Sequence, residues 1–124
     1  MSSFNGKARY PVKSNQLGMR ELNISYLGAS GDTVGGPDQK MVTVTDNTGG
    51  NYTITLADKA KATYGNSVFV KGFSMLTEDT TLWVEAVTSS SVTVQCRSIA
   101  GTPADADADF QICLGVHDWK IEYA

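Results

Sequence analysis

The chain of 124 residues has little of what carries chemistry or anchors a protein: two cysteines, one histidine and no long hydrophobic run. Two cysteines are far fewer than a disulfide scaffold holds, so Cys96 and Cys113 are expected to be free core thiols, with pairing as the alternative. Any His-based acid or base step must use His117. Without an apolar run of signal or membrane-span length, we expect neither export through a signal peptide nor a membrane anchor.

The charge of the chain is modest and unevenly distributed. Ten Lys plus Arg oppose 13 Asp plus Glu, a net charge of −3, which disfavours a protein that grips phosphate backbones, so nucleic acid is not an expected partner. The first 20 residues contain four of the basic residues and no acidic one. Six basic and 13 acidic residues remain after residue 20, a net charge of −7. The sequence therefore predicts a basic arm on an acidic body.

From Leu22 onward, apolar residues recur at every second position, the spacing that places side chains on one face of a β-strand. Seven or eight short strands follow from this pattern, in segments 22–26, 42–45, 52–56, 68–76, 82–87, 92–96, 110–114 and 119–123. A turn or bulge is predicted between the last two segments, at Gly115 to Asp118. Within 82–87, Leu82, Val84 and Ala86 are expected to share one face.

Turn-forming residues separate these segments and indicate how they connect. Asp46 to Asn51 predicts a hairpin loop longer than two residues, and Ser89 to Ser91 a tight connection between antiparallel strands. Gly72 indicates a bulge, and the alanines and lysines of 57–64 favour a short helical turn.

Together these features predict an all-β fold: a small antiparallel β-sandwich or jelly-roll-like barrel with a short helical turn and an extended N-terminal arm. The size and composition of the chain fit one domain. We assign residues 1–20 to the arm and residues 21–124 to a single β-sandwich domain.

No catalytic residue is predicted. The chain has no Gly-x-Ser-x-Gly motif, and adjacent strand residues point to opposite faces, so Asp118 is badly placed to orient His117. A surface or turn histidine is the expected role. Cys96 and Cys113 lie among alternating apolar residues, which favours inert packing over nucleophilic chemistry.

Three carboxylates at alternate positions, Asp105, Asp107 and Asp109, resemble the start of a calcium-binding loop. The similarity then fails, because Phe110 stands where an EF-hand needs glycine and Val116 where it needs glutamate. A solvated loop is the favoured interpretation, and neither a metal nor a cofactor is predicted.

The N-terminal arm combines apolar and basic side chains that would gain by burial against an acidic surface. One hypothesis is a frayed tail. The other is a subunit or capsid interface in which the arm reaches the acidic loop of another subunit. The residues of this predicted interface are Phe4, Lys7, Arg9, Tyr10, Val12, Lys13, Leu17, Met19, Asp105, Asp107 and Asp109.

The second half of the chain resembles small virion proteins of tailed bacteriophages, in particular the capsid decoration or head cement proteins. The similarity runs through 64–76, the hairpin of 82–96, Gly101-Thr102 and the segment 109–117. It implies an all-β protein that forms homotrimers and binds the major capsid protein on the outside of the expanded head. The implied location is the virion surface, after synthesis in the host cytoplasm.

Three other functions stay open. A tail or fibre component would use the same kind of fold. A carbohydrate-binding β-sandwich would need aromatic platforms, for which the candidates are Trp83, Trp119, Tyr52 and Tyr64, and the Asp105 loop as a calcium site. A hydrolase would have to use His117.

Overall fold

The computed structural model describes residues 19–60, 66–99 and 104–118. The strands are β1 (Met19–Leu27), β2 (Thr33–Gly35), β3 (Val42–Asp46), β4 (Asn51–Leu56), β5 (Asn66–Met75), β6 (Thr80–Val87), β7 (Ser91–Ser98), β8 (Ala104–Asp105) and β9 (Asp109–Asp118). Two 3-10 turns complete the described part, η2 (Gln39–Met41) and η3 (Asp58–Ala60). No helix in these residues is long and apolar enough to cross a membrane.

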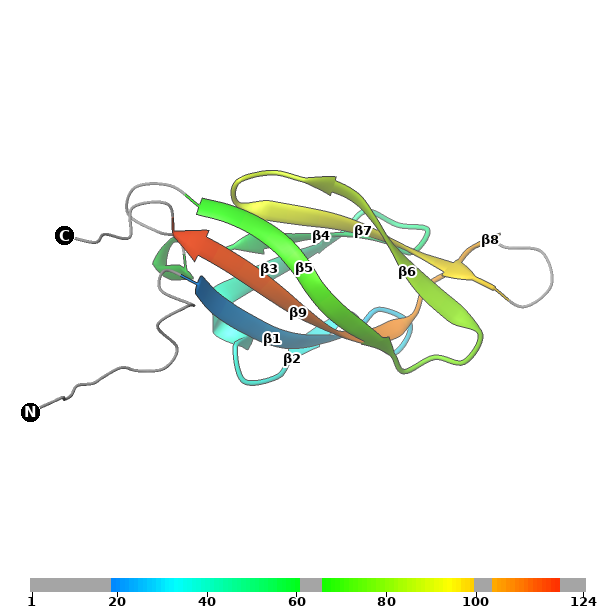
Figure 1. Cartoon of the computed structure of the whole chain (residues 1–124). Helices are drawn as coiled ribbons and strands as arrows, with labels where there is room; N and C mark the ends of the chain where they lie inside the picture. Colours follow the sequence, from blue (N-terminus) through cyan, green and yellow to red (C-terminus); the bar gives the residue numbers. More distant parts are fainter. Residues whose placement is uncertain (1–18, 61–65, 100–103, 119–124) are drawn as a thin grey trace, which may run out of the picture.

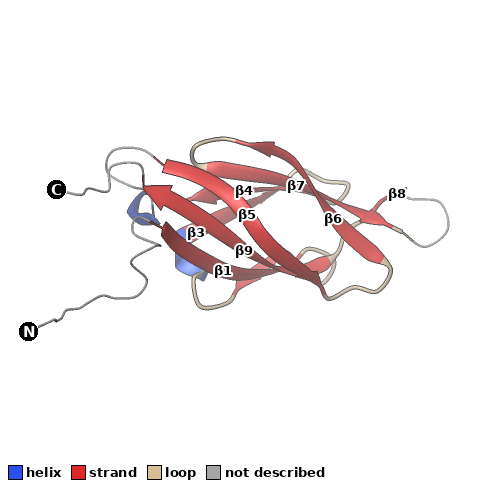
Figure 2. Cartoon of the chain, in the orientation of Figure 1, coloured by secondary structure: helices blue, strands red, loops and turns tan. Residues whose placement is uncertain are grey.

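The strands form two antiparallel sheets that pack face to face (Figures 1 and 2). One sheet has the order β2-β1-β9-β5 and the other β3-β4-β7-β6, with the short β8 beside β7. The predicted all-β fold and its sandwich architecture are therefore confirmed. The four outer strands are β2 and β5 in the first sheet and β3 and β6 in the second.

The core lies between the sheets and contains the inward-facing residue of each alternating pair. Eighteen apolar residues of the described ranges are buried, and the largest side chains among them are Tyr26, Tyr52 and Phe110. The rings of Tyr26 and Tyr52 meet edge-on with centroids 4.9 Å apart, and each lies 6.0 Å from Phe110. Because β4 and β1 belong to different sheets, this aromatic cluster joins the two layers.

Most of the predicted connections are confirmed. β3 and β4 pair through the loop after Asp46, β6 pairs with β7, and the register of β5 shifts between Val70 and Gly72, where a bulge was expected. The predicted helical turn is present as η3, and the remainder of 57–64 after Ala60 lies outside the described residues.

The bounds of β1 and β9 differ from prediction. β1 begins at Met19, so residues 19 and 20 of the predicted arm belong to a strand. The predicted turn at Gly115 to Asp118 is wrong, because β9 continues to Asp118. Gly115 is accommodated within the strand because the ring of Phe69 occupies the space that a side chain there would take. The predicted strand 119–123 lies outside the described residues.

The turn between β3 and β4 requires glycine at position 50. Gly50 has a φ of +77°, and a Cβ at this position would clash with the carbonyl oxygen of Ala106. Gly50→Ala is therefore expected to lower the free energy of unfolding by at least about 2 kcal/mol in urea denaturation. Gly72→Ala is the matched control, since a Cβ there meets nothing within 4 Å. Equal stability of the two variants would contradict this assignment.

Candidate functional site

The three predicted interface carboxylates lie close to one another, but two of them hold the fold. Asp107 accepts a hydrogen bond from the Tyr52 hydroxyl at 3.0 Å. Asp109 accepts bonds from the Ala29 N–H at 3.0 Å and the Ser30 hydroxyl at 2.6 Å. Asp105 forms an exposed ion pair with Arg97 at 3.7 Å. No group of three His, Cys, Asp or Glu side chains in the described chain could hold a metal ion.

The arm residues of the predicted interface are only partly described. Met19 starts β1 and is half-buried, whereas Phe4, Lys7, Arg9, Tyr10, Val12, Lys13 and Leu17 lie outside the described residues. Arg20, which the sequence grouped with the arm, donates a 2.6 Å hydrogen bond to the Ala60 carbonyl. One of its guanidinium N–H groups is thus bonded within its own chain.

The histidine and the cysteines do not form a reactive group. His117 is exposed on the outer face of β9, and Cys113 lies four residues away on the same face, roughly 13 Å along a strand. That separation is too long for a nucleophile and its base. Both cysteines are free, as expected. Cys96 is a core thiol, whereas Cys113 is half-buried on the outer face of β9, so its predicted place in the core is wrong. Burial raises both thiol pKa values, that of Cys96 to about 12.

Only one of the predicted aromatic platforms is placed on the surface. Tyr52 is fully buried, so its predicted role as a platform is wrong. Trp83 is 54% exposed, with the Arg97 guanidinium 5.1 Å from the ring centroid. Trp83 and Arg97 border a hollow of about 170 Å³ with Glu85 and Gln95. Trp119 and Tyr64 lie outside the described residues.

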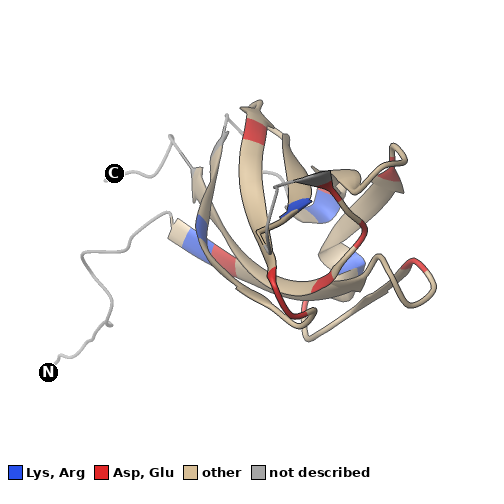
Figure 3. Ribbon diagram, turned by 90° about the vertical axis from the view of Figure 1, so that its right-hand side faces the viewer, with Lys and Arg blue, Asp and Glu red and all other residues tan. Residues whose placement is uncertain are grey.

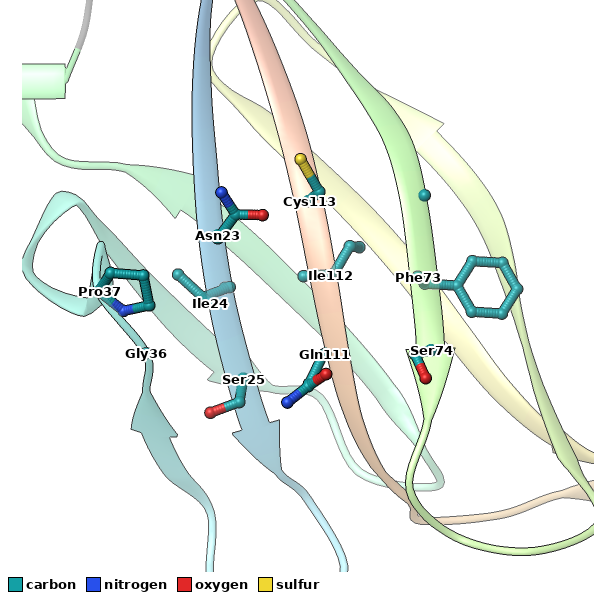
Figure 4. A pocket seen from close by; sticks show the side chains of 11 residues that line it. Asn23, Ile24, Ser25, Gly36, Pro37, Phe73, Ser74, Gln111, Ile112 and Cys113 are labelled. Carbon is teal, nitrogen blue, oxygen red and sulfur yellow. The ribbon is translucent and has the colours of Figure 1, made fainter.

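A larger, shallow hollow of about 360 Å³ lies on the β2-β1-β9-β5 sheet (Figure 4). Its polar side chains come from three strands: Asn23 and Ser25 on β1, Gln111 on β9 and Ser74 on β5. The thiol of Cys113 adjoins them. These groups can exchange hydrogen bonds with a ligand, but His117 does not line the hollow, and the raised pKa of Cys113 disfavours a thiolate.

The most distinctive surface of the described chain is apolar. Its exposed large hydrophobic residues, each between 36% and 55% exposed, all lie on β5, on β6 or beside the turn that joins them. We call this set of residues the apolar edge: Phe69, Phe73, Leu76, Trp83, Val84, Val87 and Ile99. Phe69 pairs with Gly115 and Trp83 with Gln95, so these two rings lie on the outer faces of the two sheets, to either side of the border. Ile99 belongs to it because its N–H donates a 2.8 Å hydrogen bond to the carbonyl of Asp79, next to the start of β6. No other surface of the described residues exposes large apolar side chains.

The apolar edge arises because β5 and β6 are the outer strands on one side of the sandwich. Val84 and Val87 pair with Val94 and Val92, which are fully buried, yet both lie about half exposed. Phe73 pairs with buried Ile112 and is also about half exposed. These side chains point toward the opposite sheet but are not covered by it.

A register shift between Val84 and Ala86 changes the expected pattern of β6. Val84 pairs with buried Val94, whereas Ala86 pairs with Thr93, so the predicted common face of Leu82, Val84 and Ala86 is not maintained. β5 has its own shift between Val70 and Gly72. Both long outer strands therefore carry an irregularity near their middle, which disfavours the regular addition of another strand.

Acidic side chains concentrate at one end of the sandwich, which faces the viewer in Figure 3. We call this end the acidic pole: Asp32, Asp46, Glu78, Asp79, Asp105, Asp107 and Asp109. Backbone hydrogen bonds hold its loops together, from Gly28 to Ala108, from Leu76 to Asp109 and from Ala106 to Cys96. Arg97 is the one basic side chain among the described residues of this end.

Comparison of the chain with protein-family models, with curated proteins and with solved structures gives no match.

Buried groups whose pKa values are raised make the fold sensitive to alkali. Burial, followed by the hydrogen bond to Asp32, raises the pKa of Tyr26 from 10.0 to about 12, and burial raises that of Cys96 from 9.0 to about 12. Burial and the bond to Asp107 also raise the pKa of Tyr52. As pH rises, the unfolded chain loses these protons before the folded one, so stability is complete below about pH 9 and falls toward pH 12.

Urea unfolding followed by circular dichroism between pH 7 and pH 10.5 measures this effect. The urea concentration at the unfolding midpoint should decrease once the pH exceeds about 9. Cys96→Val should make this decrease shallower because one titrating group is removed. A urea midpoint that stays constant up to pH 10.5 would show that the tyrosines and Cys96 have the same pKa values in the folded and the unfolded chain.

Proposed function

We propose that the chain is a structural virion protein that decorates the outside of an expanded tailed-phage head and stabilises it. The observation that carries the proposal is the apolar edge, a set of exposed side chains on two adjoining outer strands that lacks a cover within the described chain. The resemblance of the second half to capsid decoration proteins supports the same function. The proposed partners are copies of the chain itself, in a homotrimer, and the major capsid protein.

The size of the apolar edge is suited to an interface. Aromatic side chains bury ~150–250 Å² each, so the three aromatic residues of the edge leave on the order of 250 Å² uncovered. With its four aliphatic residues the set exposes on the order of 500 Å², divided between the border and the two outer faces. A standard interface buries about 800 Å² per partner, so the edge would supply part of such a contact.

Binding to the assembled lattice would stabilise the head by mass action, because the protein binds the closed shell and not its separated subunits. Each trimer would touch several capsid subunits, which raises the effective concentration of every further contact. A tail or fibre component is the alternative within the same structural class, and it would assemble into rings or fibres.

The apolar edge predicts a specific loss of function. Trp83→Gln combined with Val87→Thr should weaken the binding to expanded heads of the phage that encodes the chain. Since an interface tryptophan contributes about 2 kcal/mol or more, the dissociation constant should rise roughly thirtyfold. Co-sedimentation with purified heads measures the binding, and the temperature at which heads release DNA measures their stabilisation.

Thr43→Ser is the matched control, because Thr43 is exposed on β3, the outer strand at the other side of the same sheet. It should bind and stabilise heads like the unchanged protein. A protein that is monomeric in solution and does not sediment with heads would overturn the proposed function. Rings or fibres in negative-stain images would assign it to the tail instead.

A further inference from the structure

We propose that residues 1–18 of one copy dock on the apolar edge of a second copy, at the end of the edge that borders the acidic pole. This inference rests on the self-assembly within the proposed function and names the segment that makes the contact. The acceptor comprises Leu76, Ile99 and the exposed carboxylates of Glu78 and Asp79.

The acceptor places apolar and acidic groups side by side. Leu76 and Ile99 are each more than half exposed, and Glu78 and Asp79 lie in the turn between β5 and β6. The backbone fixes their positions: the Leu76 N–H donates to the Asp109 carbonyl and the Ile99 N–H to the Asp79 carbonyl, both at 2.8 Å. A segment that covers this surface must therefore supply both apolar and basic side chains.

The composition of residues 1–18 matches that requirement. The segment contains three basic residues, no acidic one and six apolar or aromatic residues larger than alanine: Met1, Phe4, Tyr10, Pro11, Val12 and Leu17. Its apolar side chains would cover the edge while Lys7, Arg9 and Lys13 meet the carboxylates of the acidic pole. Asp105, Asp46 and Asp32 are also exposed at this pole and extend the acidic surface beyond the turn.

The place where the segment joins the sandwich allows it to reach a second copy. Met19 pairs with His117 at one end of β1, whereas Leu27 pairs with Asp109 at the acidic pole. The nine residues of β1 separate these ends by roughly 30 Å, and the chain enters β1 at the end away from the pole (Figure 1). Eighteen residues can span about 60 Å, enough to reach a neighbour's acceptor.

Such a contact joins two different surfaces of the same chain. Contacts of this kind are heterologous, and they close into a ring when the rotation between copies allows it. The trimer of the proposed function is one such ring. The irregularities in β5 and β6 are compatible with this mode, because side chains rather than a continuous backbone ladder would make the contact.

Zero-length cross-linking of the full chain tests the contact directly. Equal amounts of unlabelled and ¹⁵N-labelled protein are mixed, dissociated and reassociated, then treated with a carbodiimide, which joins a lysine amine to a carboxylate in contact with it. Mass spectrometry should find Lys7 or Lys13 joined to Glu78 or Asp79 in peptides that combine both isotopes. If both peptides of every cross-linked pair are labelled or both are unlabelled, the segment docks on its own copy and the proposal is overturned.

Charge reversal supplies an independent measurement. Lys7→Glu with Lys13→Glu, or Glu78→Lys with Asp105→Lys, should each raise the dissociation constant of the oligomer at least about tenfold in sedimentation velocity. The four substitutions combined in one chain should restore association, which a merely misfolded variant would not do. Asp58→Lys is the matched control, since Asp58 lies in η3, outside the acidic pole, and should leave association unchanged.

The outcomes separate this inference from the proposed function. If the reversed variants stay trimeric and bind heads, the docking of residues 1–18 is wrong and the proposed function stands. If the unchanged chain is monomeric and ignores heads, the proposed function fails as well. Restored association in the combined variant, together with mixed-isotope cross-links, supports the docking.

Discussion

The structure depends on the anchoring of the segment 104–109 between the two sheets. Tyr52, at the centre of the core, donates a hydrogen bond to Asp107, and the backbone of Ala106 and Ala108 bonds to β7 and to the loop after β1. Because β9 starts at Asp109, these bonds also fix where the central strand of the first sheet begins. The hydrogen bond between Tyr52 and Asp107 thus connects the interior aromatic cluster to the acidic loops at this end.

This anchoring explains why carboxylates accumulate at a single end. Asp32, Asp107 and Asp109 each accept a hydrogen bond from a side chain of another segment, so the loops need acidic acceptors for their own folding. The same requirement concentrates acidic residues at the end of the sandwich where these loops meet. The proposed docking surface would therefore lie beside residues that hold the loops, so a substitution at this end has to be checked for stability as well as for binding.

Much of the fold could be predicted from the sequence because half-buried strands impose a period of two. The pattern identified β1, β3, β4, β7 and the bulge at Gly72. The continuation of β9 through Gly115 was missed because an aromatic ring from β5 replaces the absent side chain, a contact that only tertiary structure shows. The apolar edge was missed for a related reason: alternation places Val84 on the inner face but does not tell whether the opposite sheet covers it. The acidic spacing indicated Asp105 to Asp109, yet its internal bonds depend on Tyr52 and Ser30, which are distant in sequence.

The irregularities in the middle of β5 and β6 also bear on what the protein avoids. If the chain is the virion component proposed above, many copies of it are made within one cell, where flat apolar strand borders would nucleate fibrils by repeated backbone pairing. A kink halfway along each long border limits such pairing to a few residues. The copies could then expose apolar side chains without joining into fibrils before they assemble.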